Sequence, residues 1–135
     1  MRVLHSLIAS VALVAACGHL ASAPPAVVAG QSVQLQNGQS AAVAGSTVQV
    51  QFVRAADSRC PADAVCITAG EAAIEMVLSG SGPTQTVTLR LRPSKTSVTA
   101  TYGGLLFEAT ALDPYPTLQP SSTQTLTLRV TALSS

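Results

Sequence analysis

Tryptophan is absent from this chain of 135 residues, aromatic residues of all kinds make up 3% of it, and charged residues make up 10%. Seven Lys and Arg residues stand against six Asp and Glu residues, which gives a formal net charge of +1. So few cations cannot form the basic face that nucleic-acid binding requires, and we expect no nucleic-acid partner. The 47% of hydrophobic residues excludes an intrinsically disordered chain, and the length fits a single domain.

Histidine is also scarce: His5 and His19 both precede the region that we expect to fold. The folded region therefore lacks the general base of Ser-His-Asp and Cys-His sites and the imidazole ligand of many zinc and copper sites. We predict a protein that is not an enzyme and that has no cofactor and no metal site. An enzyme that uses carboxylates alone stays open as an alternative. Its candidate residues are Glu71, Glu75, Glu108 and Asp113.

The N-terminal region has the features of an export signal. Arg2 supplies a positive charge, and residues 7–16 form an apolar stretch of about ten residues, the usual length in a signal peptide. A membrane-spanning helix would need about 20 apolar residues. We therefore predict a signal peptide over residues 1–16.

Two cleavage sites compete in this region. Residues 14–17 (VAAC) resemble a bacterial lipobox, in which small residues precede a cysteine that becomes N-terminal and lipidated. Residues 21–23 (ASA) match the A-x-A pattern of ordinary signal peptidase, but cleavage there would leave Pro24 directly after the cut, where its rigid ring fits a protease poorly. We predict lipidation at Cys17, with cleavage after Ala23 and soluble secretion as the alternative.

Residues 17–30 lack Asp, Glu, Lys and Arg, and their small residues and Pro-Pro pair predict a flexible tether behind the lipidated N-terminus. No Asp follows Cys17, and an Asp at that position often marks retention at the inner membrane in enterobacterial lipoproteins. We therefore expect a lipid anchor in the membrane of the bacterial cell envelope, with the outer membrane or the periplasmic side favoured. A secreted or periplasmic soluble protein is the alternative.

From residue 31 onward, polar and apolar residues alternate with a period of two, which is typical of strands with one wet face. Residues 86–92 (TVTLRLR) give the clearest example, with Val87, Leu89 and Leu91 on one face. Breakers such as Asn37-Gly38 separate the runs and indicate turns. The expected strands lie at residues 32–36, 41–44, 47–52, 72–78, 86–92, 97–101, 105–112 and 125–132.

These strands predict an all-β fold over residues 31–135. Seven to eight short strands at regular spacing favour a single antiparallel β-sandwich, Ig-like or jelly-roll-like, with a barrel as the alternative. Few large rings are available for the core. A domain of about 100 residues with so few aromatic side chains would gain from a covalent crosslink.

The three cysteines predict where that crosslink lies. If Cys17 carries lipid, Cys60 and Cys66 remain to pair with each other in an exported protein. Redox catalysis normally uses a C-x-x-C motif at a helix N-terminus, whereas five residues separate this pair and no helix is expected. We predict a structural disulfide that closes a short loop, and we take Asp57, Arg59 and Asp63 as candidate contact residues of that loop.

Residues 57–61 (DSRCP), followed by Cys66 and by Ala69-Gly70, resemble a motif of uncharacterised small bacterial lipoproteins and exported proteins. The family pattern continues with C-x-W-A-G and a later P-Y-P segment, which residues 114–116 match. This chain departs from the pattern at Thr68, where the family has Trp. The resemblance covers roughly residues 45–132 and implies a fold and a location, but no activity.

These features together predict a non-enzymatic lipoprotein of the bacterial envelope that serves as a structural or protein-interaction module. Its expected partners are the membrane, through the lipid anchor, and another envelope protein. The alternative is a small secreted inhibitor or ligand-binding domain that uses the Cys60–Cys66 loop as a rigid probe, since a rigid loop loses little conformational freedom on binding.

Overall fold

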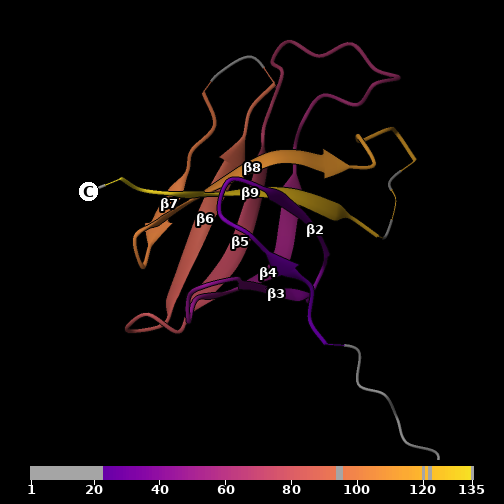
Figure 1. Ribbon diagram of the computed structural model, residues 1–135. Coiled ribbons are helices and arrows are strands. Elements are labelled where there is room, and N and C mark those ends of the chain that lie inside the picture. Colours follow the sequence, from indigo (N-terminus) through magenta and orange to yellow (C-terminus); the bar gives the residue numbers. More distant parts are fainter. Residues whose placement is uncertain (1–22, 94–95, 120, 122, 135) are drawn as a thin grey trace, which may run out of the picture.

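The computed structural model describes residues 23–93, 96–119, 121 and 123–134. The predicted signal peptide and the predicted lipidation site Cys17 lie outside these residues. The described part of the chain contains strands and no helix, so it includes no helix that could cross a bilayer (Figure 1).

Nine strands follow one another along the residues that the structure describes. Their bounds are β1 Ala26–Val27, β2 Ser32–Gln36, β3 Ser40–Val43, β4 Gln49–Asp57, β5 Ala72–Ser79, β6 Gln85–Leu91, β7 Ala100–Tyr102, β8 Leu105–Asp113 and β9 Thr125–Ala132. Eight of them overlap the eight stretches that alternation predicted, whereas β1 was not expected. The prediction of seven to eight strands is therefore one or two short of the nine strands in the described residues.

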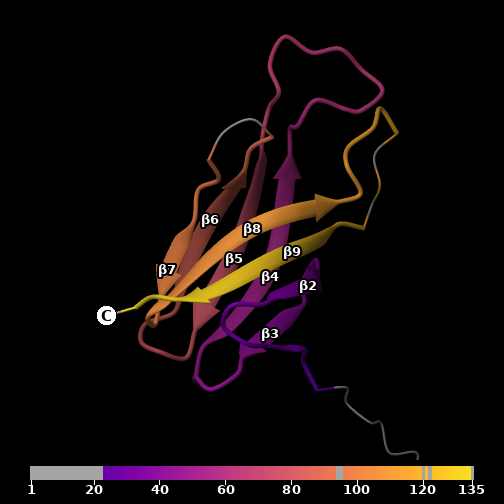
Figure 2. The ribbon, with the colours of Figure 1, turned by 45° about the horizontal axis from the view of Figure 1, so that its top comes forward.

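The strands form two separate sheets that face each other, as a β-sandwich does (Figures 1 and 2). One sheet has the order β1-β3-β4-β5-β6, and the other has the order β2-β9-β8-β7. Because the sheets do not close into one cylinder, the barrel alternative is wrong. All strand pairs are antiparallel, as predicted, with the exception of β1 and β3, which run parallel.

Strand β1 lies in the segment that was predicted as a tether, so the ordered fold begins before residue 31. The backbone N–H of Ala42 donates to the carbonyl of Pro25 at 3.0 Å, and that of Ala44 donates to the carbonyl of Val27 at 2.8 Å. The side chain of Val27 is buried in the core. A two-residue strand is too short to produce a readable alternation, which explains why the sequence pattern missed it.

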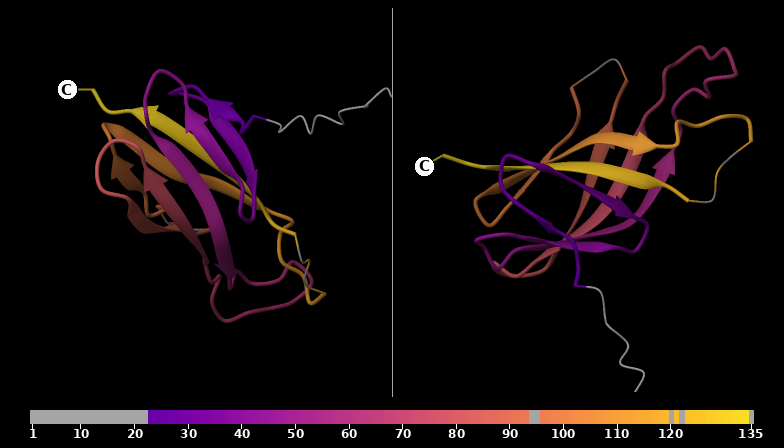
Figure 3. Two further views of the ribbon diagram at one scale, coloured as in Figure 1. Left: turned by 90° about the horizontal axis from the view of Figure 1, so that it is seen from below. Right: turned by 45° about the vertical axis from the view of Figure 1, so that its right-hand side comes forward.

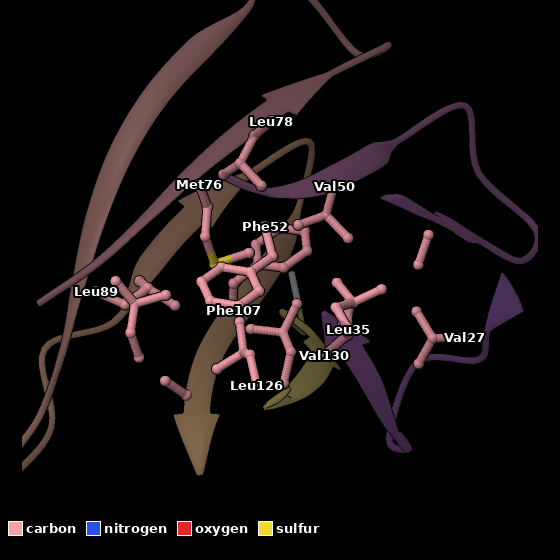
Figure 4. Packing of buried hydrophobic residues seen from close by; sticks show 14 of the residues in the cluster. Val27, Leu35, Val50, Phe52, Met76, Leu78, Leu89, Phe107, Leu126 and Val130 are labelled. Carbon is pink, nitrogen blue, oxygen red and sulfur yellow. The ribbon is translucent and has the colours of Figure 1, made fainter. Parts of the chain in front are cut away.

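The core lies between the two sheets and is mainly aliphatic. Phe52 of β4 and Phe107 of β8 meet at its centre and are fully buried, with Met76 and Val130 beside them (Figure 4). Every second side chain is buried between the sheets at the start of β4, along β5 and along β9 up to Val130. On β6, Leu89 is buried, whereas Val87 and Leu91 are only partly covered.

Two connections meet at one end of the sandwich: the loop from β4 to β5, and the first residues of the connection from β8 to β9. The indigo segment that begins the described chain lies beside β3, away from the tip of the β4–β5 loop in each ribbon view (Figures 1, 2 and 3). The loop from β4 to β5 contains both cysteines of the predicted disulfide. We therefore expect a functional site at this end of the molecule.

Candidate functional site

Asp57 and Arg59 form a buried ion pair at the base of the β4–β5 loop. Arg59 Nη2 lies 2.7 Å from Asp57 Oδ2, and Arg59 Nε donates to Asp57 Oδ1 at 2.8 Å. The side chain of Arg59 is 5% exposed and that of Asp57 is 8% exposed. Asp57 Oδ1 also accepts the backbone N–H of Arg59 at 3.2 Å, which closes a turn of the kind that Asp favours. Both candidate contact residues are thus turned into the fold.

The guanidinium of Arg59 also connects the β4–β5 loop to the β8–β9 connection. Its Nη2 donates to the carbonyl oxygen of Leu112 at 2.8 Å. Its Cζ lies 4.4 Å from the centre of the Tyr115 ring, which is cation–π geometry. One buried side chain therefore holds together two segments that are more than 50 positions apart in the sequence.

A second set of hydrogen bonds joins the same two segments nearer the surface. The backbone N–H of Ala62 donates to the carbonyl of Pro116 at 2.9 Å. The third candidate contact residue, Asp63, accepts the backbone N–H of Leu118 at its Oδ1 at 2.9 Å. Asp63 therefore fixes the neighbouring segment through its carboxylate.

The predicted disulfide between Cys60 and Cys66 is confirmed, with the two Cα atoms 5.9 Å apart. Its seven-residue loop sits on a continuation of the β4–β5 ladder, in which Ser58 N–H donates to Glu71 O and Cys60 N–H donates to Ala69 O, both at 2.9 Å. The β4–β5 loop is thus held by a ladder at its base, a crosslink at its middle and hydrogen bonds at its side.

Removal of the disulfide in a Cys60→Ser/Cys66→Ser variant should lower the free energy of unfolding by about 2 kcal/mol, because the unfolded chain regains the freedom of a seven-residue loop. Urea unfolding of the oxidised protein and the variant measures this difference. A reducing agent should bring the wild type to the variant's stability and leave the variant unchanged. Equal stability of the oxidised protein and the variant would contradict the prediction.

The β4–β5 loop exposes apolar side chains that the sequence analysis did not single out. Val65 and Ile67, on either side of Cys66, are 103% and 104% exposed, which means that nothing in the described chain covers them. In the adjoining connection, Leu118 is 66% exposed and Tyr115 is 42% exposed. We call these four side chains the two-loop surface. The sequence did contain a signal for this apolar surface, because two β-branched apolar residues flank a cysteine in a predicted loop.

The acidic residues of the alternative enzyme site are divided between the sheets. Glu75 lies on β5 of the five-stranded sheet and pairs with Arg54 at 2.8 Å, and Glu71, directly before β5, pairs with Arg90 and Arg92. Glu108 and Asp113 lie on β8 of the other sheet. Among the described residues, no group of three His, Cys, Asp or Glu side chains is placed to hold a metal ion.

The hydrogen bond from Arg92 Nε, at 2.8 Å, lowers the pKa of Glu71 below its ordinary value of 4.5, and the contact with Arg90 adds to this effect. Because the pKa is lower in the folded protein, Glu71 stabilises the fold above its ordinary pKa. That contribution disappears as the pH falls through the lowered value.

A Glu71→Gln variant should therefore be less stable than the wild type at pH 7, and the difference should shrink below pH about 4.5. Urea unfolding at pH 7 and at pH about 3 measures this change. The same comparison in an Arg92→Gln background should show a smaller dependence on pH, because the main cause of the lowered pKa is gone. A stability difference between the wild type and Glu71→Gln that is identical at both pH values would contradict the lowered pKa of Glu71.

Comparisons of the chain with protein-family models, with curated proteins and with solved structures give no match. The features that bear on function are therefore the geometry of the two-loop surface and the sequence of the N-terminus.

Proposed function

We propose that this protein is a non-enzymatic, lipid-anchored module of the bacterial envelope that binds another envelope protein through the two-loop surface. The observation that carries the proposal is the full exposure of Val65 and Ile67 on a loop that is closed by a disulfide. Neither side chain contributes to the packing of the domain. Their presence on a fixed loop is the arrangement expected of contact residues.

The rigidity of the surface supports binding to a protein. Association loses less entropy when the contact residues are already ordered. Here the crosslink Cys60–Cys66, the Arg59–Asp57 pair and the hydrogen bond from Leu118 to Asp63 hold both segments before any partner arrives. Apolar side chains at the centre of such a surface are the usual source of binding energy between proteins.

The position of the two-loop surface also fits an anchored protein. Residue 23 begins the segment that pairs with β3, and this segment lies away from the tip of the β4–β5 loop (Figure 1). Cys17 precedes it by six residues, which in an extended chain span at most about 20 Å. We infer that a lipid on Cys17 would hold this segment near the bilayer and direct the two-loop surface away from it.

The resemblance to small bacterial lipoproteins supports the same location. We further propose that the sandwich is of the Ig-like or jelly-roll-like type, both of which pack two antiparallel sheets face to face. This proposal concerns the type of fold and does not affect the proposed contact surface.

Mass spectrometry of the mature protein from its host separates the main proposal from the secreted alternative. The proposal predicts an N-terminal Cys17 that carries acyl chains. A mature chain that starts at Pro24, without lipid, would instead favour a secreted inhibitor or ligand-binding domain. The contact surface would be the same in both cases.

Affinity enrichment from solubilised envelopes tests the contact surface. A Val65→Asp/Ile67→Asp variant should keep the thermal stability of the wild type, because both side chains are fully exposed, and should lose the proteins that the wild type enriches. The matched control is Val28→Asp/Leu133→Asp, which alters two half-exposed apolar residues outside the two-loop surface. Equal enrichment by all three proteins would show that the two-loop surface makes no contact.

A further inference from the structure

A groove of about 340 Å³ opens beside the buried ion pair, between the end of β6 and the end of β8. Its lining combines apolar side chains with two guanidinium groups. The residues that matter here are Leu91, Pro93, Leu112, Tyr115, Arg59 and Arg92. A volume of this size lies at the lower end of the range for small-molecule sites, which usually combine apolar walls with a few polar groups.

Arg59 brings unused hydrogen-bond donors to this groove. Of the five N–H groups of its guanidinium, Nε donates to Asp57, and Nη2 donates to Asp57 and to the carbonyl of Leu112. Its Nη1 has no partner among the described residues, although the side chain is only 5% exposed. No fully buried side-chain nitrogen in the described chain lacks a partner, so Nη1 must still touch open space, and Arg59 lines this groove.

Arg92 brings a second set of unused donors. Its Nε donates to Glu71 Oε2, while its Nη1 and Nη2 have no partner among the residues that the structure describes. Glu71 pairs with Arg90 as well as with Arg92. The two arginines and the one glutamate together therefore carry one excess positive charge. The groove thus joins two guanidinium groups with free N–H groups to an apolar lining.

We propose that this groove binds a carboxylate carried by an apolar group, whose oxygens accept N–H groups from Arg59 Nη1 and Arg92 while its carbon part contacts Leu112 and Tyr115. A planar guanidinium matches a carboxylate in shape and charge, and hydrogen bonds between the two are strong. Two sources share this chemistry: the C-terminal residue of a peptide and a free amphipathic acid. The proposal goes beyond the proposed function, because the groove shares only Tyr115 with the two-loop surface and is not lined by Val65, Ile67 or Leu118.

Calorimetric titration of the oxidised full domain tests the proposal with three probes. Acetyl-alanyl-leucine carries a terminal carboxylate and an apolar side chain, its C-terminal amide lacks the charge, and decanoate represents a free acid. We expect binding of at least one acid and at least tenfold weaker binding of the amide. Binding of the dipeptide acid alone assigns the source to a peptide terminus, and binding of decanoate alone assigns it to a free acid.

Variants of charged residues outside the buried core then locate the bound acid. Arg92→Gln should weaken its affinity by about tenfold, because one charge-assisted contact is lost. Asp113→Asn should strengthen binding, because Asp113 is an exposed acid that lines the groove and repels an anion. Arg129→Gln removes the same charge from an exposed site on β9 and should leave the affinity unchanged.

Three results would overturn the proposal. They are no measurable binding of either acid, equal binding of the dipeptide acid and its amide, and equal loss of affinity in Arg92→Gln and Arg129→Gln. The last result would identify a non-specific charge effect. Because Arg92, Arg129 and Asp113 are not part of the buried core, circular dichroism of each variant should match the wild type and confirm that folding is intact.

Discussion

Replacement of Arg59 by leucine is expected to lower the free energy of unfolding by about 3–5 kcal/mol, because it leaves Asp57 as a buried charge without its partner. The carboxylate of Asp57 is only 8% exposed and receives two hydrogen bonds from the Arg59 side chain. The carbonyl of Leu112 and the ring of Tyr115 would lose their contacts with the same guanidinium. Urea unfolding of the purified domain measures the change.

Two further variants separate the buried charge from the loss of packing. An Asp57→Asn/Arg59→Leu variant should recover part of the lost stability, since no unpaired charge remains. Arg54→Leu breaks an exposed pair with Glu75 and should change stability by about 0.5 kcal/mol or less. If Arg59→Leu and Arg54→Leu had equal effects, Arg59 would not connect the two segments as described.

The second large effect is expected at Gly70, where the backbone has a φ of 68° in the left-handed region. A Cβ at this position would overlap the carbonyl oxygen of Ser58 and lie 2.7 Å from its carbonyl carbon. Because the obstacle is backbone at the base of the β4–β5 loop, it cannot turn aside as a side chain would. A Gly70→Ala variant should therefore lose about 2–4 kcal/mol of stability.

Gly38 supplies the control for Gly70→Ala. It also has a positive φ, of 82°, but a Cβ there would meet nothing within 4 Å. Gly38→Ala should therefore cost only the conformational strain, about 1 kcal/mol. A Gly70→Ala variant that is no less stable than Gly38→Ala would mean that the base of the β4–β5 loop can shift to admit a side chain.

The alternation of polar and apolar residues was sufficient to predict most of this fold. Strands such as β5 and β9 place every second side chain in the core, so their pattern can be read directly from the sequence. The pairing of β1 with β3 could not be read in this way, because two residues carry no period. The division into two sheets depends on contacts between distant strands, which alternation alone does not specify.

The candidate site was only partly predictable. Counting cysteines identified the Cys60–Cys66 disulfide, because the prediction of a lipid on Cys17 leaves two cysteines to pair. The role of Arg59 could not be predicted, because its partner Leu112 lies in a distant strand and the local sequence suggests a solvated loop residue. Val65 and Ile67 were missed because apolar residues are expected inside a domain, whereas the crosslinked loop holds these two outside.

Photo-crosslinking in living host cells tests most directly whether the two-loop surface contacts a protein. A benzoylphenylalanine residue would be placed at position 67 in one strain and, as the control, at the exposed position 129 on β9 in another. We predict a discrete crosslinked product of defined mass from position 67 and none from position 129. The absence of any product from position 67, or identical products from both positions, would contradict the account.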